Sequence, residues 1–364
     1  MERNYLLLTP GPLSTSDTVR QAMMQDWCTW DKDYNEGIVT PLRRDLLEIA
    51  GLDEAKYTTV LLQGSGTYCV EATIGATVRP ADRLLILANG AYGQRMARIA
   101  DYYGINYSLV SLPETELVTG EVARRALEQY PDVTHLAMVH SETTTGLLNR
   151  IEEVADVIRG RGLTFIVDAM SSCAGVPIDI AALGIDFLVS SANKCVQGVP
   201  GFGFIIARRD RLMQTKGCAR SLSLDIYDQW ETMERGHGKW RFTSPTHVVR
   251  AFYQAMQELK AEGGIAARHR RYVENHRVLV EGMRSLGFQT LLADEAQGCI
   301  ITSFLYPDAA FDFASFYEQL KARGFVIYPG KISQADTFRI GNIGDVFPDD
   351  FRRLIEAVRE VLQA

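Results

Sequence analysis

The chain has 364 residues, 46% of them hydrophobic and 23% charged, which is the balance of a soluble globular protein with room for two domains. Its net charge of −7 argues against nucleic acid or an anionic membrane as the main partner, and leaves room for a local basic pocket that binds a small anion. The apolar start is too short for a signal peptide or a membrane span, and none of the six cysteines stands in a C-x-x-C pair. We therefore expect a cytoplasmic protein with reduced thiols.

The first 20 residues are predicted to form an extended N-terminal arm. Pro10 and Pro12 bracket Gly11, and this combination keeps the backbone extended while it allows a close approach to another group. A helix that carries Leu42 and Leu46 on one face follows the arm.

Strands and helices alternate through residues 59–190, which favours an α/β domain with a mostly parallel sheet flanked by helices. We place this large domain at residues 21–255. Short strands then alternate with helices beyond residue 290, which predicts a smaller C-terminal α+β domain at residues 256–364.

One glycine-rich turn is a candidate anion site. The strand Thr59–Leu62 runs through Gly64 into Ser65-Gly66-Thr67 and then into a helix, so free backbone N–H groups and two hydroxyls meet at a helix start. The segment lacks the spacing of a dinucleotide site or a P-loop. A plain turn with helix capping by a hydroxyl explains the segment equally well.

Polar side chains follow the next strands. Tyr92 comes after the strand Leu84–Ala88, and a hydroxyl-rich turn that includes Thr143 comes after the strand His135–His140. The carboxyl ends of parallel strands are where ligands bind. The alternatives are an aromatic ring that packs on the sheet and hydroxyls that satisfy their own backbone.

Asp168 and Lys194 each follow an apolar strand, and a short helix at residues 179–183 is expected between them. If both strands run parallel, both side chains emerge at the same edge of the sheet. A buried carboxylate needs a cationic or donor partner, and a buried lysine has a lowered pKa that makes its amine a nucleophile and a base. The alternative for Lys194 is a side chain whose head simply reaches water.

The second half of the chain offers fewer candidates. Residues 217–246 are expected to form a long irregular stretch, and the basic cluster at residues 268–271 is expected to be a solvated helix face. His269 and His276 lack acidic or cysteine partners nearby, so no metal site is expected. Arg339 lies inside a strand and needs a partner: a carboxylate or phosphonate ligand suits its forked donors, and a structural salt bridge is the alternative.

Taken together, these residues suit pyridoxal phosphate. Its phosphate needs N–H and hydroxyl donors, its ring needs a flat partner, its ring nitrogen needs a carboxylate, and its aldehyde needs a lysine. Each residue is a weak signal alone, and their occurrence in one order is a stronger one.

The chain also resembles the class V aminotransferases of pyridoxal-phosphate fold type I over nearly its whole length. The resemblance is carried by the following segments: NYLLLTPGPL (4–13), LLQGSGTY (61–68), HSETTTG (140–146), IVDAMSS (166–172), SSANKCVQGVPG (190–201), HGKWRFTSPTH (237–247) and YPGKISQADTFRIGNIG (328–344). It implies a large cofactor-binding domain, a smaller C-terminal domain and a homodimer with shared active sites.

The resemblance implies a role for each candidate residue. Lys194 would hold the cofactor covalently and Asp168 would pair with its ring nitrogen. Arg339 would bind the acidic end of the substrate. The other cofactor contacts would be the phosphate cup of Ser65, Gly66 and Thr67, the stacking Tyr92, the neighbouring Thr143 and Asn193, and Thr243, which would reach the phosphate bound in the partner subunit. Cys173-Ala174 departs from the Phe-Gly that the resemblance leads us to expect, which bears on substrate preference.

Two of these segments, at residues 190–201 and 237–247, resemble members that move the amino group of 2-aminoethylphosphonate to pyruvate, giving phosphonoacetaldehyde and L-alanine. The nearest alternative is an alanine–glyoxylate or serine–pyruvate type of aminotransferase, and a lyase or desulfurase with the same cofactor is a further one. A non-catalytic anion-binding α/β protein is the alternative from another class.

Overall fold

A seven-stranded sheet forms the centre of the larger part of the chain in the computed structural model, which describes residues 5–330, 332 and 335–363. Its strands lie in the following order: β2 (Tyr57–Gly64), β10 (Gly201–Arg208), β9 (Phe187–Ser191), β8 (Thr164–Asp168), β5 (His135–Val139), β3 (Leu84–Ala88) and β4 (Tyr107–Ser111). β10 runs opposite to the other six strands, so its pairings with β2 and β9 are antiparallel and the remaining pairings are parallel. The expected mostly parallel sheet is therefore confirmed.

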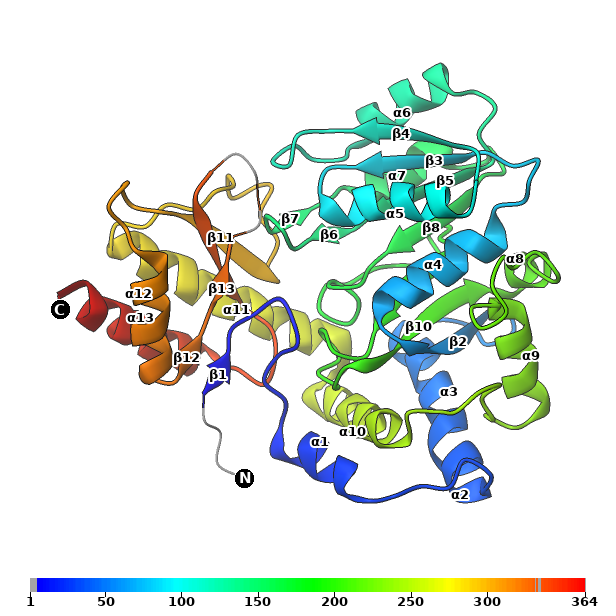
Figure 1. Cartoon of the computed structure of the whole chain (residues 1–364), viewed down its shortest axis with the longest axis horizontal. Coiled ribbons are helices and arrows are strands. Elements are labelled where there is room, and N and C mark those ends of the chain that lie inside the picture. The colour runs from blue at the N-terminus through cyan, green and yellow to red at the C-terminus, as the bar shows by residue number, and fades with distance from the viewer. Residues whose placement is uncertain (1–4, 331, 333–334, 364) are drawn as a thin grey trace.

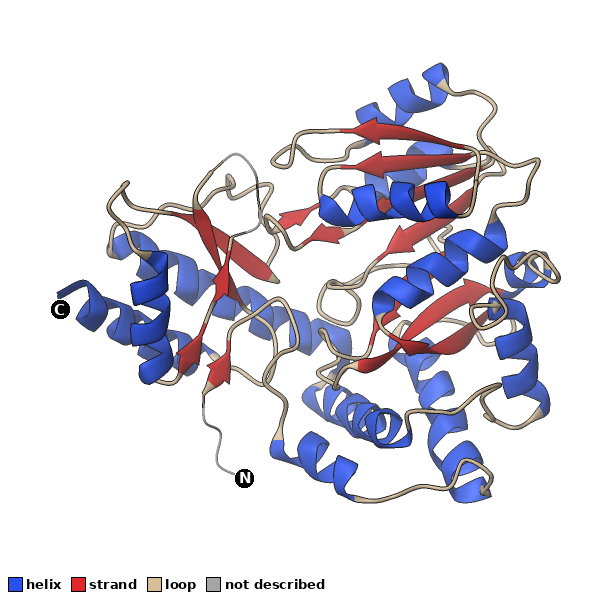
Figure 2. Cartoon of the chain, in the orientation of Figure 1, coloured by secondary structure: helices blue, strands red, loops and turns tan. Residues whose placement is uncertain are grey.

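Helices cover both faces of this sheet because its strands are apolar on both sides (Figures 1 and 2). Leu85 and Leu87 belong to one buried cluster, whereas Leu84 and Ile86 belong to the other. The first face is covered by α3 (Thr40–Ile49), α6 (Gly120–Gln129), α7 (Ile151–Ile158) and α10 (Thr246–Glu262). The second is covered by α4 (Gly66–Thr77) and α5 (Ala91–Tyr102).

A smaller α+β part follows, with its own core of phenylalanines that includes Phe304 and Phe338. Its sheet has the order β11 (Ile301–Leu305), β14 (Thr337–Gly341) and β13 (Tyr328–Pro329), and its helices are α11 (Gly264–Ser285), α12 (Phe313–Ala322) and α13 (Pro348–Gln363). The arm joins this part, since β1 (Leu6–Leu7) pairs in parallel with β12 (Phe325–Val326). The predicted smaller C-terminal domain is therefore present.

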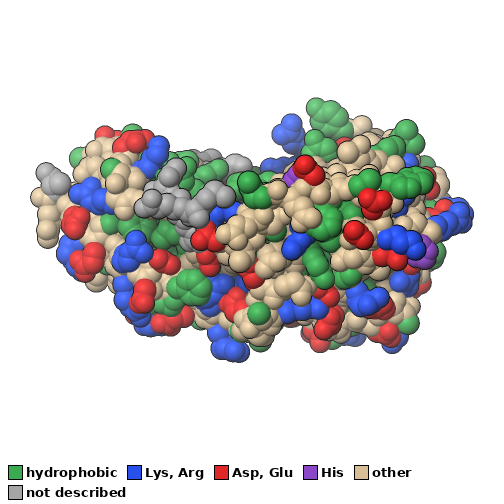
Figure 3. Space-filling view, turned by 90° about the horizontal axis from the view of Figure 1, so that it is seen from below, with side chains coloured by type: hydrophobic (Ala, Val, Ile, Leu, Met, Phe, Trp, Pro, Cys, Tyr) green, Lys and Arg blue, Asp and Glu red, His purple; other side chains and the backbone are tan. Residues whose placement is uncertain are grey.

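The remaining elements are short or lie at the periphery. They are α1 (Asp17–Gln21), the 3₁₀ helix η1 (Ala22–Met24), α2 (Lys32–Tyr34), the π-helix η2 (Asn35–Val39), β6 (Ser141–Glu142), β7 (Leu147–Leu148), α8 (Arg209–Met213) and α9 (Ile226–Arg235). Among the helices that the structure describes, none has the length and apolar character needed to cross a membrane. Acidic and basic side chains are interspersed on the face seen in Figure 3.

Three local predictions are wrong. Residues 179–183 form a turn, because the Asp179 carboxylate accepts from Ala182 N and Gly184 then adopts φ +64°, which ends the segment after one turn. The stretch at residues 217–246 contains α9, which is capped by Asp225 and packs against the edge strand β2. The basic cluster is not a solvated face throughout, because Arg268 is only 2% exposed and pairs with Glu262.

The domain bounds at residues 255 and 256 stay a prediction. They fall inside α10, and the nearest break in the helices is the glycine pair Gly263-Gly264, in which both residues have positive φ. Of the segments that carry the family resemblance, residue 4 of the first and residues 331, 333 and 334 of the last lie outside the described residues.

Candidate active site

A cavity of about 240 Å³ lies at the carboxyl edge of the large sheet, where β2, β3, β5, β8 and β9 all end. Parallel strands put the residues that come after them at one edge, so eight of the ten predicted site residues line this cavity. These eight are Ser65, Gly66, Thr67, Tyr92, Thr143, Asp168, Asn193 and Lys194. Thr243 and Arg339 lie outside its lining.

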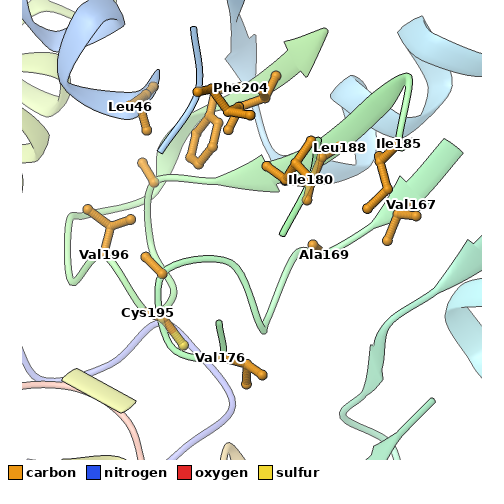
Figure 4. Packing of buried hydrophobic residues seen from close by; sticks show 14 of the residues in the cluster. Leu46, Val167, Ala169, Val176, Ile180, Ile185, Leu188, Cys195, Val196 and Phe204 are labelled. Carbon is orange, nitrogen blue, oxygen red and sulfur yellow. The ribbon is translucent and has the colours of Figure 1, made fainter. Parts of the chain in front are cut away.

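Asp168 is the last residue of β8 and points toward the face that carries α4 and α5. Its neighbours Val167 and Ala169 lie in the buried cluster on the opposite face, with Cys195 in the same cluster (Figure 4). Burial raises the pKa of Asp168 to about 6, and its Oδ1 accepts from Met170 N at 2.9 Å. The carboxylate therefore lacks a direct cationic partner among the described residues and is suited to a protonated ligand nitrogen.

Lys194 reaches the same cavity from the loop after β9. Burial lowers the pKa of its amine to about 8, an effect opposed by the nearby Cys195 and Asp168. Its Nζ donates to the carbonyl of Pro10 in the N-terminal arm at 2.5 Å. The amine is thus held by a neutral acceptor, and it becomes a nucleophile at mildly alkaline pH.

The start of α4 forms an open anion cup. Ser65 is the N-cap residue of α4, yet its side chain makes no capping hydrogen bond. A Cβ on Gly66 would lie 1.9 Å from the sulfur of Met170, so a larger residue would displace the Met170 side chain, which lines the same cavity. Tyr68 N donates to Ser65 O at 3.0 Å, and the backbone N–H groups of Gly66 and Thr67 at the helix start offer donors to a ligand.

Arg339 lies on β14, beside the cavity and 3% exposed. Its Nε donates to Pro329 O at 2.9 Å and its Nη1 donates to Thr143 O at 2.8 Å. No carboxylate of a described residue lies within 4.0 Å of it, so the structural salt bridge that was the alternative is absent from the described part of the chain. Burial without an acidic partner lowers the pKa of this guanidinium and favours an anionic ligand.

Glu142 is a site residue that the sequence argument missed. It is fully buried and accepts hydrogen bonds from Tyr92 N at 3.3 Å and from Thr144 Oγ1 at 2.9 Å. Burial raises the pKa of this carboxyl to about 7. Because Gly90 supplies no side chain to cap α5, the carboxyl of Glu142 takes that place and joins the Tyr92 turn to the Thr143 turn. The one available signal was an acid in an otherwise hydroxyl-rich turn.

Three serines of the lining, Ser141, Ser171 and Ser191, and one arginine were also missed. Ser141 Oγ and Ser191 Oγ are buried and make no hydrogen bond with any described residue. Arg95 lies on α5 and donates from Nη1 to Thr67 Oγ1 at 3.0 Å. The serines follow strands and were within reach of the strand-end argument, whereas Arg95 lies inside a helix and carried no such signal.

Two predicted features lie away from the cavity. Thr243 is exposed, and its carbonyl accepts from Gln63 Nε2 at 2.9 Å, close along the chain to the anion cup. Ala174, where glycine was expected, adopts φ +68°, a conformation that glycine reaches without the steric cost that alanine bears. The residue types at Cys173-Ala174 therefore differ from the expected Phe-Gly. The backbone of Ala174 nevertheless has the conformation that a glycine would favour.

Comparison with known proteins identifies the family of this chain. The sequence profile of the family described as "Aminotransferase class-V" matches residues 47–331. The chain belongs to the class-V aminotransferase family, which confirms the resemblance carried by its segments.

Individual relatives within this family are similar to the chain over nearly its whole length. The chain is 67% identical over 356 residues to the 2-aminoethylphosphonate–pyruvate transaminase of Bacteroides fragilis (strain YCH46), covering 98% of each chain. It is 64% identical over 359 residues to the protein of the same name from Phocaeicola vulgatus, covering 99% of each chain. Its structure is similar to that of the alanine–glyoxylate aminotransferase from Nostoc sp., with a TM-score of 0.90 and 26% identity, covering 100% of this chain and 96% of the other.

Proposed function

We propose that this protein transfers the amino group of 2-aminoethylphosphonate to pyruvate with pyridoxal 5'-phosphate as its cofactor, yielding phosphonoacetaldehyde and L-alanine in phosphonate catabolism. The observation that carries the proposal is one cavity that brings together the amine of Lys194, the carboxyl of Asp168 and the open start of α4. The names of the relatives from Bacteroides fragilis and Phocaeicola vulgatus support the choice of substrates.

The residues present fit this cofactor. The cup at the start of α4 suits a phosphate, and the hydroxyls of Ser141 and Ser191, which bond to no described residue, offer donors to polar ring atoms. Asp168 suits the ring nitrogen, and Tyr92 offers a flat surface beside Thr143, whose Oγ1 donates to its hydroxyl at 3.2 Å. Asn193 lines the cavity next to Lys194. When bound, pyridoxal phosphate supplies an electron sink for the pair of electrons left when the donor carbon loses a proton.

Lys194 would do two things in this reaction. Its neutral Nζ would attach the cofactor through the aldehyde, and once the donor amine displaced it, the same atom would take the proton from the donor carbon and return it. Asp168 would keep the ring nitrogen protonated, because a buried carboxylate is stabilised by an adjacent cation. Glu142 and Thr144 would keep the Tyr92 turn in place.

Arg339 would bind the acidic end of both substrates in turn. Among the described residues, Pro329 O and Thr143 O accept from two of the five N–H donors of Arg339, which leaves the other three for a ligand. A planar fork suits a phosphonate in the first half of the reaction and a carboxylate in the second. One site can therefore serve both halves of a ping-pong exchange.

We also propose a homodimer in which Thr243 contacts the phosphate in the partner subunit. Its exposure and its absence from the lining of the cavity in its own chain support this arrangement. The test is a hybrid dimer of Lys194→Ala with Thr243→Val. If Thr243 acts across the interface, one intact site forms and activity returns to about half of wild type; if Thr243 acts within its own chain, the hybrid stays as weak as its parents.

The main experiment measures alanine formation from pyruvate with a panel of amine donors and the purified, cofactor-loaded protein. A strong preference for 2-aminoethylphosphonate supports the proposal. Preference for serine or for glyoxylate as acceptor would move the assignment to the alanine–glyoxylate or serine–pyruvate type. A protein that binds phosphate but shows no transfer with any donor would favour the non-catalytic alternative. The cytoplasmic location stays a prediction.

A further inference from the structure

The guanidinium of Arg95 is a positive charge in the candidate site, and none of the roles proposed above involves it. Arg95 lies on the first turns of α5 and lines the cavity together with Lys194. Its Nη1 donates to Thr67 Oγ1 at 3.0 Å, and its guanidinium lies 4.9 Å from the ring centroid of Tyr92. It therefore contacts both the anion cup and the aromatic ring.

Arg95 makes no salt bridge with a described residue, and the acid that feels its charge is Asp168 across the cavity, whose burial-raised pKa it lowers. No carboxylate of a described residue lies within 4.0 Å of its guanidinium, whereas Arg268 and Arg271 both pair with Glu262. Within the described part of the chain its guanidinium meets one hydroxyl and one ring face, which leave most of its donors unused. A partly buried arginine in this condition stabilises an anion placed beside it.

We infer that Arg95 is the cationic ligand of the cofactor phosphate, an inference that rests on the proposed function. The cup at residues 65–67 offers only hydroxyls, backbone N–H groups and the partial charge of a helix start, which is about half an elementary charge. A phosphate ester carries nearly two negative charges at neutral pH. Arg95 reaches the cup through Thr67 and supplies the missing full charge.

Position separates this role from that of Arg339. Arg339 contacts the carbonyl of Thr143, and the hydroxyl end of Tyr92 also lies at Thr143. Arg95 lies over the face of the Tyr92 ring and contacts Thr67 instead. The two arginines thus bind at different places, one at the phosphate cup and one at the substrate's acidic end.

The experiment compares two ligands that differ only in the phosphate. Wild type and Arg95→Gln are stripped of cofactor, and the dissociation constants of pyridoxal 5'-phosphate and pyridoxal are measured by absorbance titration. Arg95→Gln should weaken pyridoxal phosphate about 10- to 100-fold, as expected for the loss of a charge-assisted contact, while pyridoxal changes less than about twofold. Arg95→Lys should recover part of the loss.

The matched control is Arg98→Gln, which removes an equal charge from the exposed side of the same helix and should change neither constant. Equal weakening of both ligands by Arg95→Gln, or of neither, would overturn the inference. So would an unchanged pyridoxal phosphate constant together with a raised KM for 2-aminoethylphosphonate. Failure of the proposed function is distinguishable: a wild type that prefers another amine donor would still bind pyridoxal phosphate and leave the role of Arg95 testable, whereas a wild type that binds no pyridoxal phosphate would refute the cofactor itself.

Discussion

The Nζ atom of Lys194 donates a hydrogen bond to the carbonyl oxygen of Pro10 at 2.5 Å, although 184 positions separate the two residues. Next to Pro10, Gly11 adopts φ +117°, and a Cβ there would lie 2.9 Å from Lys194 Cδ. The arm is held by Gly341 N, which donates to Leu8 O at 2.9 Å two residues after Arg339. The arm therefore connects the lysine of the large part with the arginine strand of the small part.

Gly11→Ala should lower kcat about tenfold or more, because the added methyl group displaces either the Lys194 side chain or the arm. The measurement is steady-state kinetics together with the absorbance of bound cofactor. The control is Gly287→Ala, which also has positive φ, at +91°, but no atom within 4 Å of the added Cβ. Similar kinetic losses in both variants would mean that backbone strain alone, not contact with Lys194, is responsible.

Covalent capture of pyridoxal phosphate by the cofactor-free protein should accelerate up to about pH 8 and then level off. Burial lowers the pKa of Lys194 to about 8, and only the neutral amine attacks an aldehyde. Below the pKa the rate should fall about tenfold for each pH unit, because the fraction of Lys194 with a neutral amine falls by the same factor. Stopped-flow absorbance gives these rates, and Lys194→Ala should show no covalent phase. A midpoint near the ordinary lysine value, about 10.4, would contradict the burial argument.

Glu142→Gln should change how stability depends on pH. Burial raises the pKa of Glu142 from 4.5 to about 7, so between these values the folded protein keeps a proton that the unfolded chain releases. The contribution of this carboxyl to the free energy of unfolding is fully present below pH 4.5 and is lost as the pH rises through 7. At about 1.36 kcal/mol per pH unit, the whole contribution is about 3 kcal/mol.

Urea unfolding of the cofactor-free protein at pH 5 and pH 8 measures this effect. Relative to wild type, Glu142→Gln should gain about 2.5 kcal/mol on going from pH 5 to pH 8, because the amide does not ionise. Glu318→Gln, at an exposed position, should follow wild type at both values. A constant difference between Glu142→Gln and wild type would contradict the prediction.

Arg339→Lys should raise KM for both 2-aminoethylphosphonate and pyruvate about 10- to 100-fold, because lysine keeps the charge and loses the fork that reaches Pro329, Thr143 and the ligand together. Steady-state kinetics of each half-reaction checks this expectation, and the cofactor absorbance should persist. Arg353→Lys, at an exposed position, is the control. A rise confined to one substrate would show that the two acidic ends do not share this arginine.

Much of the candidate site could be predicted from the sequence because its residues stand directly after apolar strands. Runs such as Thr164–Val167 and Phe187–Val189 are recognisable as buried strands, and parallel strands bring the residues after them to one edge of the sheet. Asp168, Lys194 and Thr143 therefore meet in one cavity without further information about packing. The alternation of such strands with helices also indicated the α/β architecture, whereas the class-V family was indicated by the resemblance of whole segments.

Other features depend on how distant segments pack, and no local pattern encodes that. Arg268 stands in a basic run that is typical of a solvated face, yet Glu262 lies across the Gly263-Gly264 break and pairs with it in the interior. Its Nη1 donates to the carbonyl of Cys195 at 2.6 Å, next to Lys194. Burying a charge is tolerated only where a partner meets it, and that partner is set by the fold.

The sequence by itself determined which side chains stand at the ends of the strands, because strand periodicity and turn residues act over a few positions. Only the tertiary structure decided that Pro10 meets Lys194, that Glu142 caps the start of α5 and that Arg95 reaches Thr67. Each of these contacts joins segments that approach one another only when the sheet, its helices and the smaller part pack together. Hydrophobic burial drives that packing without direction, so the polar contacts it creates are specified by the whole fold.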